Sequence, residues 1–188
     1  RFNRPYIKVF EEERELTLML LIDVSGSLDF GSRGQKKKDM VTEIAATLAF
    51  SAMNNNDKIG VIFFSDRIEK FIPPKKGRKH ILFIIRELLD FVPASRKTSL
   101  ATGIQYLTQV MKRRSTVFIF SDFLDPAPFA DPLLVAGKKH DVTAIQVYDS
   151  LFSDLPDVGL LRIEDAETGL QQWLDTSSAA IREGQKRW

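Results

Sequence analysis

The sequence contains no cysteine, and its 188 residues include only two histidines. These absences exclude a disulfide framework, a thiolate nucleophile and a cysteine-based zinc site. A chain without cysteine is compatible with a reducing cytoplasm, which is where we expect this protein to reside. No apolar run approaches the roughly 18 residues that a membrane-spanning helix needs, so we expect no membrane span in this chain.

A large excess of charge of one sign is also missing, because 27 lysines and arginines face 25 aspartates and glutamates. Nucleic-acid-binding domains usually carry a concentrated basic excess, so we expect no nucleic-acid partner. We interpret the short basic clusters at 36–38, 75–79 and 112–114 as solvated surface, with anion or nucleic-acid binding as the alternative. The cluster at 36–38 lies near the polar edge described below, where it can help to hold an acidic partner.

The domain organisation follows from length and composition. Hydrophobic residues make up 44% of the chain, which is enough to bury a core, and the length fits one domain. We expect residues 1–15 to be a remnant of a preceding segment that leads into one folded domain at 16–188.

Hydrophobic patterning predicts strands that alternate with helices. Nearly continuous apolar runs, typical of strands buried on both faces, lie at 16–22, 58–64, 116–121 and 142–148. Helical periodicity is found at 37–53, 78–91, 100–111, 129–139 and 175–188. A tight turn after the second run predicts an antiparallel strand at 68–72, and a last edge strand is expected at 159–164. The predicted fold class is α/β, doubly wound and Rossmann-like, with a mostly parallel central sheet, one antiparallel edge strand and helices on both faces.

The helix predicted at 37–53 has an apolar stripe that should face the sheet. Its members recur at helical spacing, and they are Val41, Ile44, Leu48 and Ala52. We therefore expect Leu48 to be packed against the core.

The direction of the chain predicts where polar side chains gather. In doubly wound sheets, ligands bind beyond the carboxyl ends of the strands. Asp23 and Asp122 are each the first charged residue after an apolar strand. The antiparallel strand reverses the chain, so the helix after it returns to the same edge and delivers Thr98 there. Three segments that are distant in sequence should therefore meet at one edge.

The residues Asp23, Ser25 and Ser27 form an Asp-x-Ser-x-Ser motif at this edge. Carboxylate and hydroxyl oxygens are hard ligands that suit Mg²⁺, Mn²⁺ or Ca²⁺ rather than zinc. Thr98 adds a hydroxyl and Asp122 adds a second carboxylate. These groups do not saturate a divalent ion, so one position is left for water or for an acidic group from elsewhere. The alternative is that the motif merely caps a turn and a helix.

These five residues resemble the metal-ion-dependent adhesion site of von Willebrand factor type A domains. The resemblance implies one divalent cation, Mg²⁺ before Ca²⁺ or Mn²⁺, held by Asp23, Ser25, Ser27, Thr98 and Asp122. It also implies that an acidic side chain of a protein partner completes the coordination and that the chain has no catalytic residue. Where that family usually has glycine before the threonine, this chain has Lys97, and Ser99 is therefore an alternative ligand.

A narrower resemblance is to the prokaryotic proteins of domain-of-unknown-function family 58, which carry a type A domain at their carboxyl end. The resemblance is carried by the segments at 9–15, 121–124 and 167–169. Proteins of this family are typically associated with MoxR-type AAA+ ATPases. The resemblance therefore implies such an ATPase as the partner.

An enzyme is the competing class of function. A haloacid-dehalogenase-like phosphatase also places an aspartate and Mg²⁺ at this edge, but it needs a second aspartate where this chain has Ser25. A serine hydrolase would require Gly-x-Ser-x-Gly, and Asp23 occupies the first of those glycine positions. His80 and His140 lie on predicted helices beside basic residues, so we expect both to be solvated. We predict a metal-dependent protein-interaction module that is not an enzyme, with a Mg-dependent phosphatase-like hydrolase as the alternative.

Overall fold

The structure is a computed structural model that describes residues 15–29, 36–149 and 155–185. The segment expected to precede the domain lies outside these residues, except for its last member, Glu15. The end of the helix predicted at 175–188 also lies outside them. Among the described residues, no helix combines the length and the apolarity needed to cross a membrane.

A five-stranded sheet forms the centre of the molecule, in the order β3-β2-β1-β4-β5. The strands are β1 (Thr17–Asp23), β2 (Lys58–Phe64), β3 (Ile68–Lys75), β4 (Thr116–Ser121) and β5 (Asp141–Gln146). All neighbouring strands are parallel except β2 and β3, which form an antiparallel hairpin. The predicted sheet, mostly parallel with one antiparallel edge strand, is confirmed.

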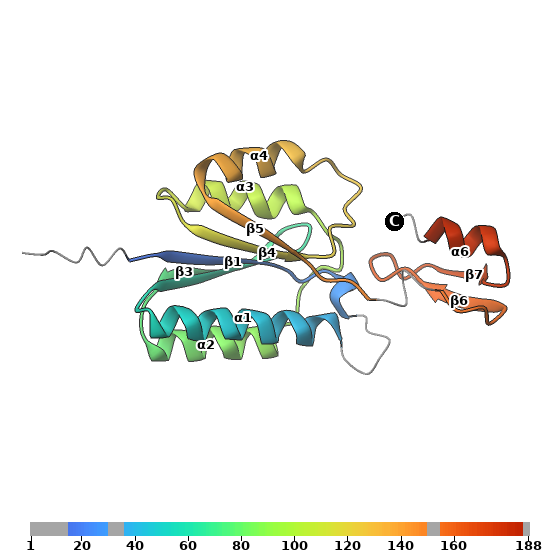
Figure 1. Ribbon diagram of the computed structural model, residues 1–188, viewed down its shortest axis with the longest axis horizontal. Coiled ribbons are helices and arrows are strands. Elements are labelled where there is room, and N and C mark those ends of the chain that lie inside the picture. Colours follow the sequence, from blue (N-terminus) through green and yellow to red (C-terminus); the bar gives the residue numbers. More distant parts are fainter. Residues whose placement is uncertain (1–14, 30–35, 150–154, 186–188) are drawn as a thin grey trace, which may run out of the picture.

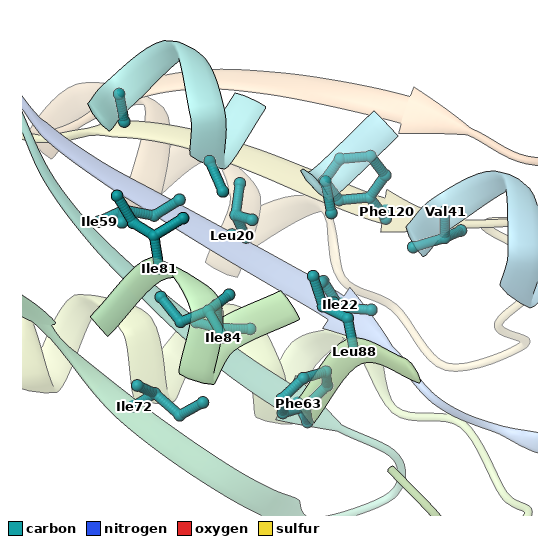
Figure 2. Close-up of a cluster of buried hydrophobic side chains, with 14 of the residues drawn as sticks. Leu20, Ile22, Val41, Ile59, Phe63, Ile72, Ile81, Ile84, Leu88 and Phe120 are labelled. Carbon is teal, nitrogen blue, oxygen red and sulfur yellow. The ribbon is translucent and has the colours of Figure 1, made fainter. Parts of the chain in front are cut away.

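Two helices cover each face of the sheet (Figure 1). They are α1 (Lys37–Asn54) and α2 (Arg78–Asp90) on one face, and α3 (Leu100–Val110) and α4 (Ala130–Lys139) on the other. Successive side chains of a strand point to opposite faces, so β1 sends Leu20 and Ile22 to one core and Met19 and Leu21 to the other. This is why its sequence is a continuous apolar run. Figure 2 shows the first core, in which Leu20 and Ile22 face the residues of α1 and α2.

The face that α1 presents to the sheet is centred on small residues. Ala45 and Ala49 are fully buried, whereas Ile44 and Leu48 are only partly buried and pack against the edge of the same core. Alanine lets the helix axis approach the sheet closely, and the larger side chains then fill the space beside the helix. The prediction that Leu48 packs against the core is confirmed. The most buried line of the helix, however, runs through Ala45 and Ala49, each one position after Ile44 and Leu48.

Close approach also requires Gly103 on α3, where a Cβ atom would lie 2.7 Å from the Phe64 ring. Gly103→Ala is therefore expected to destabilise the protein by about 1–3 kcal/mol through overpacking. The matched control is Gly137→Ala on α4, because a Cβ atom there would meet nothing within 4 Å. Alanine at that position should stabilise the protein by about 0.5–1 kcal/mol. Urea denaturation measures both, and shifts of the same sign would contradict the close-approach argument.

The chain ends in a separate hairpin and helix. β6 (Leu160–Glu164) pairs antiparallel with β7 (Gln171–Asp175), and α6 (Ala179–Gln185) follows. The strand predicted at 159–164 exists, but the prediction that it is an edge strand of the main sheet is wrong. Its partner β7 begins with two glutamines and has no apolar run, so the pattern gave no signal for it. Figure 1 shows this hairpin beyond the end of the sheet, with its turn facing that end.

Candidate metal centre

The carboxyl ends of the central strands are aligned and tied to the loop at 96–99. Asp23 of β1 is in register with Phe64 of β2, and Ile22 is in register with Phe120 of β4. Beyond the strands, the N–H of Gly26 donates to the carbonyl of Arg96 at 2.9 Å, and the N–H of Ser99 donates to the carbonyl of Ser65 at 3.0 Å. The Asp-x-Ser-x-Ser segment and the loop that carries Thr98 therefore lie at the same edge.

Asp23 is fully buried at the end of β1. Its Oδ1 accepts the N–H of Ser25 at 2.9 Å, and its Oδ2 accepts the hydroxyl of Ser121 at 2.7 Å. Burial disfavours the ionised carboxylate and raises the pKa of Asp23 to about 6, and the nearby charge of Asp122 acts in the same direction. Without a compensating cation, this carboxylate is held in an unfavourable electrostatic environment.

Asp122 follows β4 and is also buried. Its Oδ1 accepts the N–H of Leu124 at 3.2 Å, and its Oδ2 forms an ion pair with Nζ of Lys37 at 3.3 Å. Lys37 begins α1, and its side chain is only 7% exposed. The interpretation of the 36–38 cluster as solvated surface is therefore wrong for Lys37, which shares the buried helix face of Val41. The two buried carboxylates, Asp23 and Asp122, therefore share their surroundings with one positive charge, that of Lys37.

The two serines of the motif place their hydroxyls side by side. Ser25 is buried and Ser27 is half-buried, and their Oγ atoms are 3.1 Å apart. The hydrogen bond from the Ser25 N–H to the Asp23 carboxylate is what the capping alternative predicts, because it closes a local turn. That alternative does not explain why Asp23 also binds Ser121, which is 98 residues away on another strand.

The hydroxyls of Thr98 and Ser99 have different surroundings. Ser99 is the N-cap of α3, and its Oγ accepts the N–H of Thr102 at 3.3 Å. Thr98 Oγ1 is buried and has no hydrogen-bond partner in the described part of the chain. A buried hydroxyl without a partner costs free energy, and a cation at this edge would satisfy it. The residues fit a metal ion, and Thr98 suits the role of ligand better than Ser99.

Two supporting residues escaped the sequence analysis. Ser121 holds Asp23, and Asp125 accepts the N–H of Leu100 at 2.8 Å and so ties the loop after β4 to the start of α3. Their signal was weak, because a serine at the end of a strand and an aspartate in the following loop are both ordinary. Within the described ranges, no group of three or more histidine, cysteine, aspartate or glutamate side chains is placed to hold a metal. The candidate centre is therefore built from two carboxylates and several hydroxyls.

The two histidines lie away from this edge. His80 is half-buried, with Nε2 at 2.9 Å from the carbonyl of Ile59. His140 ends α4 just before the start of β5 and is 2% exposed, so the expectation that it is solvated is wrong. Burial lowers the pKa of His140. Because it precedes β5, it sits at the amino ends of the parallel strands, opposite the candidate metal centre.

The fold is similar to that of two solved structures from other organisms. An aerotolerance-related membrane protein from Bacteroides fragilis superposes with a TM-score of 0.66 at 14% identity, over 92% of this chain and 87% of that protein. Proximal thread matrix protein 1 from the mussel byssus, with a zinc-occupied MIDAS motif, gives a TM-score of 0.55 at 19% identity, over 70% of this chain and 38% of that one. At these identities the similarity shows a shared fold alone.

Curated relatives are found in mycobacteria. An uncharacterized protein of Mycobacterium tuberculosis is 32% identical over 172 residues, which are 90% of this chain and 54% of that protein. An uncharacterized protein of Mycobacterium avium is 35% identical over 101 residues, which are 53% of this chain and 60% of that protein. The chain thus spans between half and two thirds of the length of the curated relatives that it matches. The family model described as protein of unknown function DUF58 matches residues 1–187, and the chain therefore belongs to this family.

Proposed function

We propose that this chain is a metal-ion-dependent protein-interaction module with an adhesion site of the von Willebrand factor type A kind. The observation that carries the proposal is the pair of buried carboxylates, Asp23 and Asp122, at the ends of two neighbouring strands. Lys37 pairs with Asp122, so one of these two buried negative charges has no positive partner within the described residues, and burying such a charge is costly unless a cation compensates it. The proposed ligands for one divalent cation are Asp23, Ser25, Ser27, Thr98 and Asp122.

The residues of the chain would prepare the site for an acidic group. The N–H of Ser25 and the hydroxyl of Ser121 fix both oxygens of Asp23, and the N–H of Leu124 fixes one oxygen of Asp122. Serine and threonine hydroxyls add ligands without adding charge. The bound cation would supply an electrophilic centre for a carboxylate from a partner. Lys37, next to Asp122, adds positive charge that favours the same kind of group.

We further propose Mg²⁺ as the cation, with Ca²⁺ or Mn²⁺ as alternatives, because hard oxygen ligands favour these ions. The zinc-occupied MIDAS motif of the mussel protein, which shares this fold, supports a divalent cation as the ligand. The partner would be a protein that offers an acidic side chain. The resemblance to family 58 makes a MoxR-type AAA+ ATPase the first candidate.

The test is retention of a MoxR-type ATPase from the same organism on the immobilised chain. We expect retention in Mg²⁺, release by a chelator, and loss of retention in Asp23→Ala, because this variant lacks one of the two charged ligands. Asp90→Ala is the matched control, since Asp90 is exposed on α2 and, among the described residues, pairs only with Arg86. Its retention should equal that of the wild type.

A phosphate-release assay on generic esters, run beside the retention assay, tests the phosphatase alternative. Metal-dependent turnover that Asp23→Ala eliminates would overturn the interaction module in favour of an enzyme. Retention that survives both the chelator and Asp23→Ala would remove the cation from the interaction.

A further inference from the structure

The turn between β6 and β7 lies directly against the Asp-x-Ser-x-Ser segment. A Cβ atom on Gly26 would be 2.3 Å from the carbonyl oxygen of Ala166 and 3.2 Å from Cβ of Arg96. The backbone of the turn therefore occupies the space that a side chain at position 26 would need. Figure 1 shows the turn facing the end of the sheet where β1 enters the short 3₁₀ helix η1 (Gly26–Asp29). The terminal hairpin thus meets the candidate metal centre at Gly26.

The shape of this turn is fixed by Asp165. Its Oδ1 accepts the N–H groups of Glu167 at 2.9 Å and Thr168 at 2.8 Å, which lowers the pKa of Asp165. Its backbone carbonyl accepts the N–H of Gly169, which has a φ of 70° that favours glycine. The carboxylate of Asp165 is therefore engaged within the turn, and the turn holds Glu167 next to Ala166.

Glu167 differs from the other acidic residues of the hairpin. Its side chain is half-buried, yet its carboxylate has no hydrogen bond or ion pair within the described ranges. Glu164, three residues earlier, is exposed and accepts a hydrogen bond from the side chain of Gln171 at 2.8 Å. Of the acidic groups in the hairpin, Glu167 alone combines partial burial, a position beside Gly26 and a carboxylate that is uncommitted in the described structure.

We propose that Glu167 is the chain's own acidic ligand for the cation, an inference that rests on the proposed function of the site. The five residues of the sheet edge leave a position for a carboxylate, and the turn brings the backbone of Ala166, the neighbour of Glu167, to that edge. The three carboxylates of Asp23, Asp122 and Glu167 do not form one cluster in the described structure, so cation binding would have to draw the Glu167 side chain in. An intramolecular carboxylate competes at a high effective concentration, of order millimolar for a flexible tether. The hairpin is thus an internal cap, and an acidic partner has to displace Glu167 to reach the metal.

Isothermal titration of the 188-residue chain with Mn²⁺ tests this cap. Glu167→Gln should weaken Mn²⁺ binding at least about tenfold, because even indirect partners of metal ligands contribute this much. Glu164→Gln is the matched control, with the same change on the same hairpin, and should leave the affinity unchanged. Acetate should restore part of the lost affinity in Glu167→Gln, since it can fill the vacated position.

Hydrogen exchange of the amides in β6 and β7 provides a second measurement that does not depend on affinity. Mn²⁺ should slow this exchange in the wild type and in Glu164→Gln, but not in Glu167→Gln. The cap would be overturned if Glu167→Gln and the wild type had the same Mn²⁺ affinity and the same exchange rates. If Asp23→Ala also abolished Mn²⁺ binding, the proposed metal site would remain intact. A wild type that binds no Mn²⁺, or binds it as well as Asp23→Ala does, would overturn both proposals.

Discussion

Asp23→Asn is expected to stabilise the metal-free protein at pH 7 by about 3 kcal/mol. Burial raises the pKa of Asp23 from its ordinary value of 3.8 to about 6, and each unit of such a difference corresponds to about 1.4 kcal/mol. Asparagine removes the charge and keeps an oxygen for the N–H of Ser25. The hydroxyl of Ser121 can reverse and accept from the new amide.

The pH dependence of this effect has a definite sign. A carboxyl group whose pKa is higher in the folded state binds its proton more tightly there, so its contribution is stabilising below pH 3.8 and is lost as the pH rises through about 6. The advantage of Asp23→Asn over the wild type should therefore shrink between pH 7 and pH 5. Urea unfolding in a chelator at the two pH values measures it.

Addition of Mg²⁺ should reverse the order of stability. The wild type gains free energy by binding the ion, whereas the asparagine variant, with one charged ligand fewer, gains less. Asp90→Asn is the control, because that aspartate is exposed and its replacement should stay within about 0.5 kcal/mol of the wild type. A variant that is less stable than the wild type in chelator at both pH values would contradict the electrostatic account of Asp23.

Lys37→Met should have the opposite effect on the metal-free protein. It removes the amino group that pairs with Asp122 and leaves two buried carboxylates without a compensating charge. Breaking a buried ion pair by removing one partner costs about 3–5 kcal/mol. Because a metal ion can replace the lost charge, the stabilisation of the variant by Mg²⁺ should exceed that of the wild type.

The double variant Lys37→Met, Asp122→Asn separates the pair from the packing of the lysine chain. Asparagine keeps an oxygen for the N–H of Leu124, so the double variant should be more stable than Lys37→Met alone. Urea unfolding of the wild type, the two single variants and the double variant, with chelator and with Mg²⁺, completes the cycle. If Lys37→Met were as stable as the wild type in chelator, the amino group of Lys37 would not compensate the charge of Asp122.

The sheet and its polar edge could be predicted because they depend on local patterns and chain direction. The continuous apolar run of β1 indicated burial on both faces, and Asp23 and Asp122 were found because they follow apolar strands. Ser121 was missed because its bond to Asp23 depends on the alignment of β1 with β4, which no local pattern specifies.

Other features were missed because residue type misled the interpretation. Lys37 belongs to a basic cluster, and such clusters are usually solvated, but its helical spacing from Val41 places it on the buried face. His140 was expected in solvent because lysines precede it, yet it is the buried C-cap residue of α4. The hairpin partner of β6 has a polar sequence, so only the structure reveals that the Glu167 turn approaches Gly26.

The order of the strands has a consequence for the synthesis of this protein. β1 is made first, but it lies in the middle of the sheet, and its neighbour β4 is made almost 100 residues later. At about 5–20 residues per second on the ribosome, one side of β1 therefore waits several seconds for its partner. Asp122 arrives only with β4, so a nascent chain lacks one of the two proposed carboxylate ligands of the sheet edge until β4 pairs with β1. Tight cation binding at the proposed site would then mark a chain in which β4 has paired with β1.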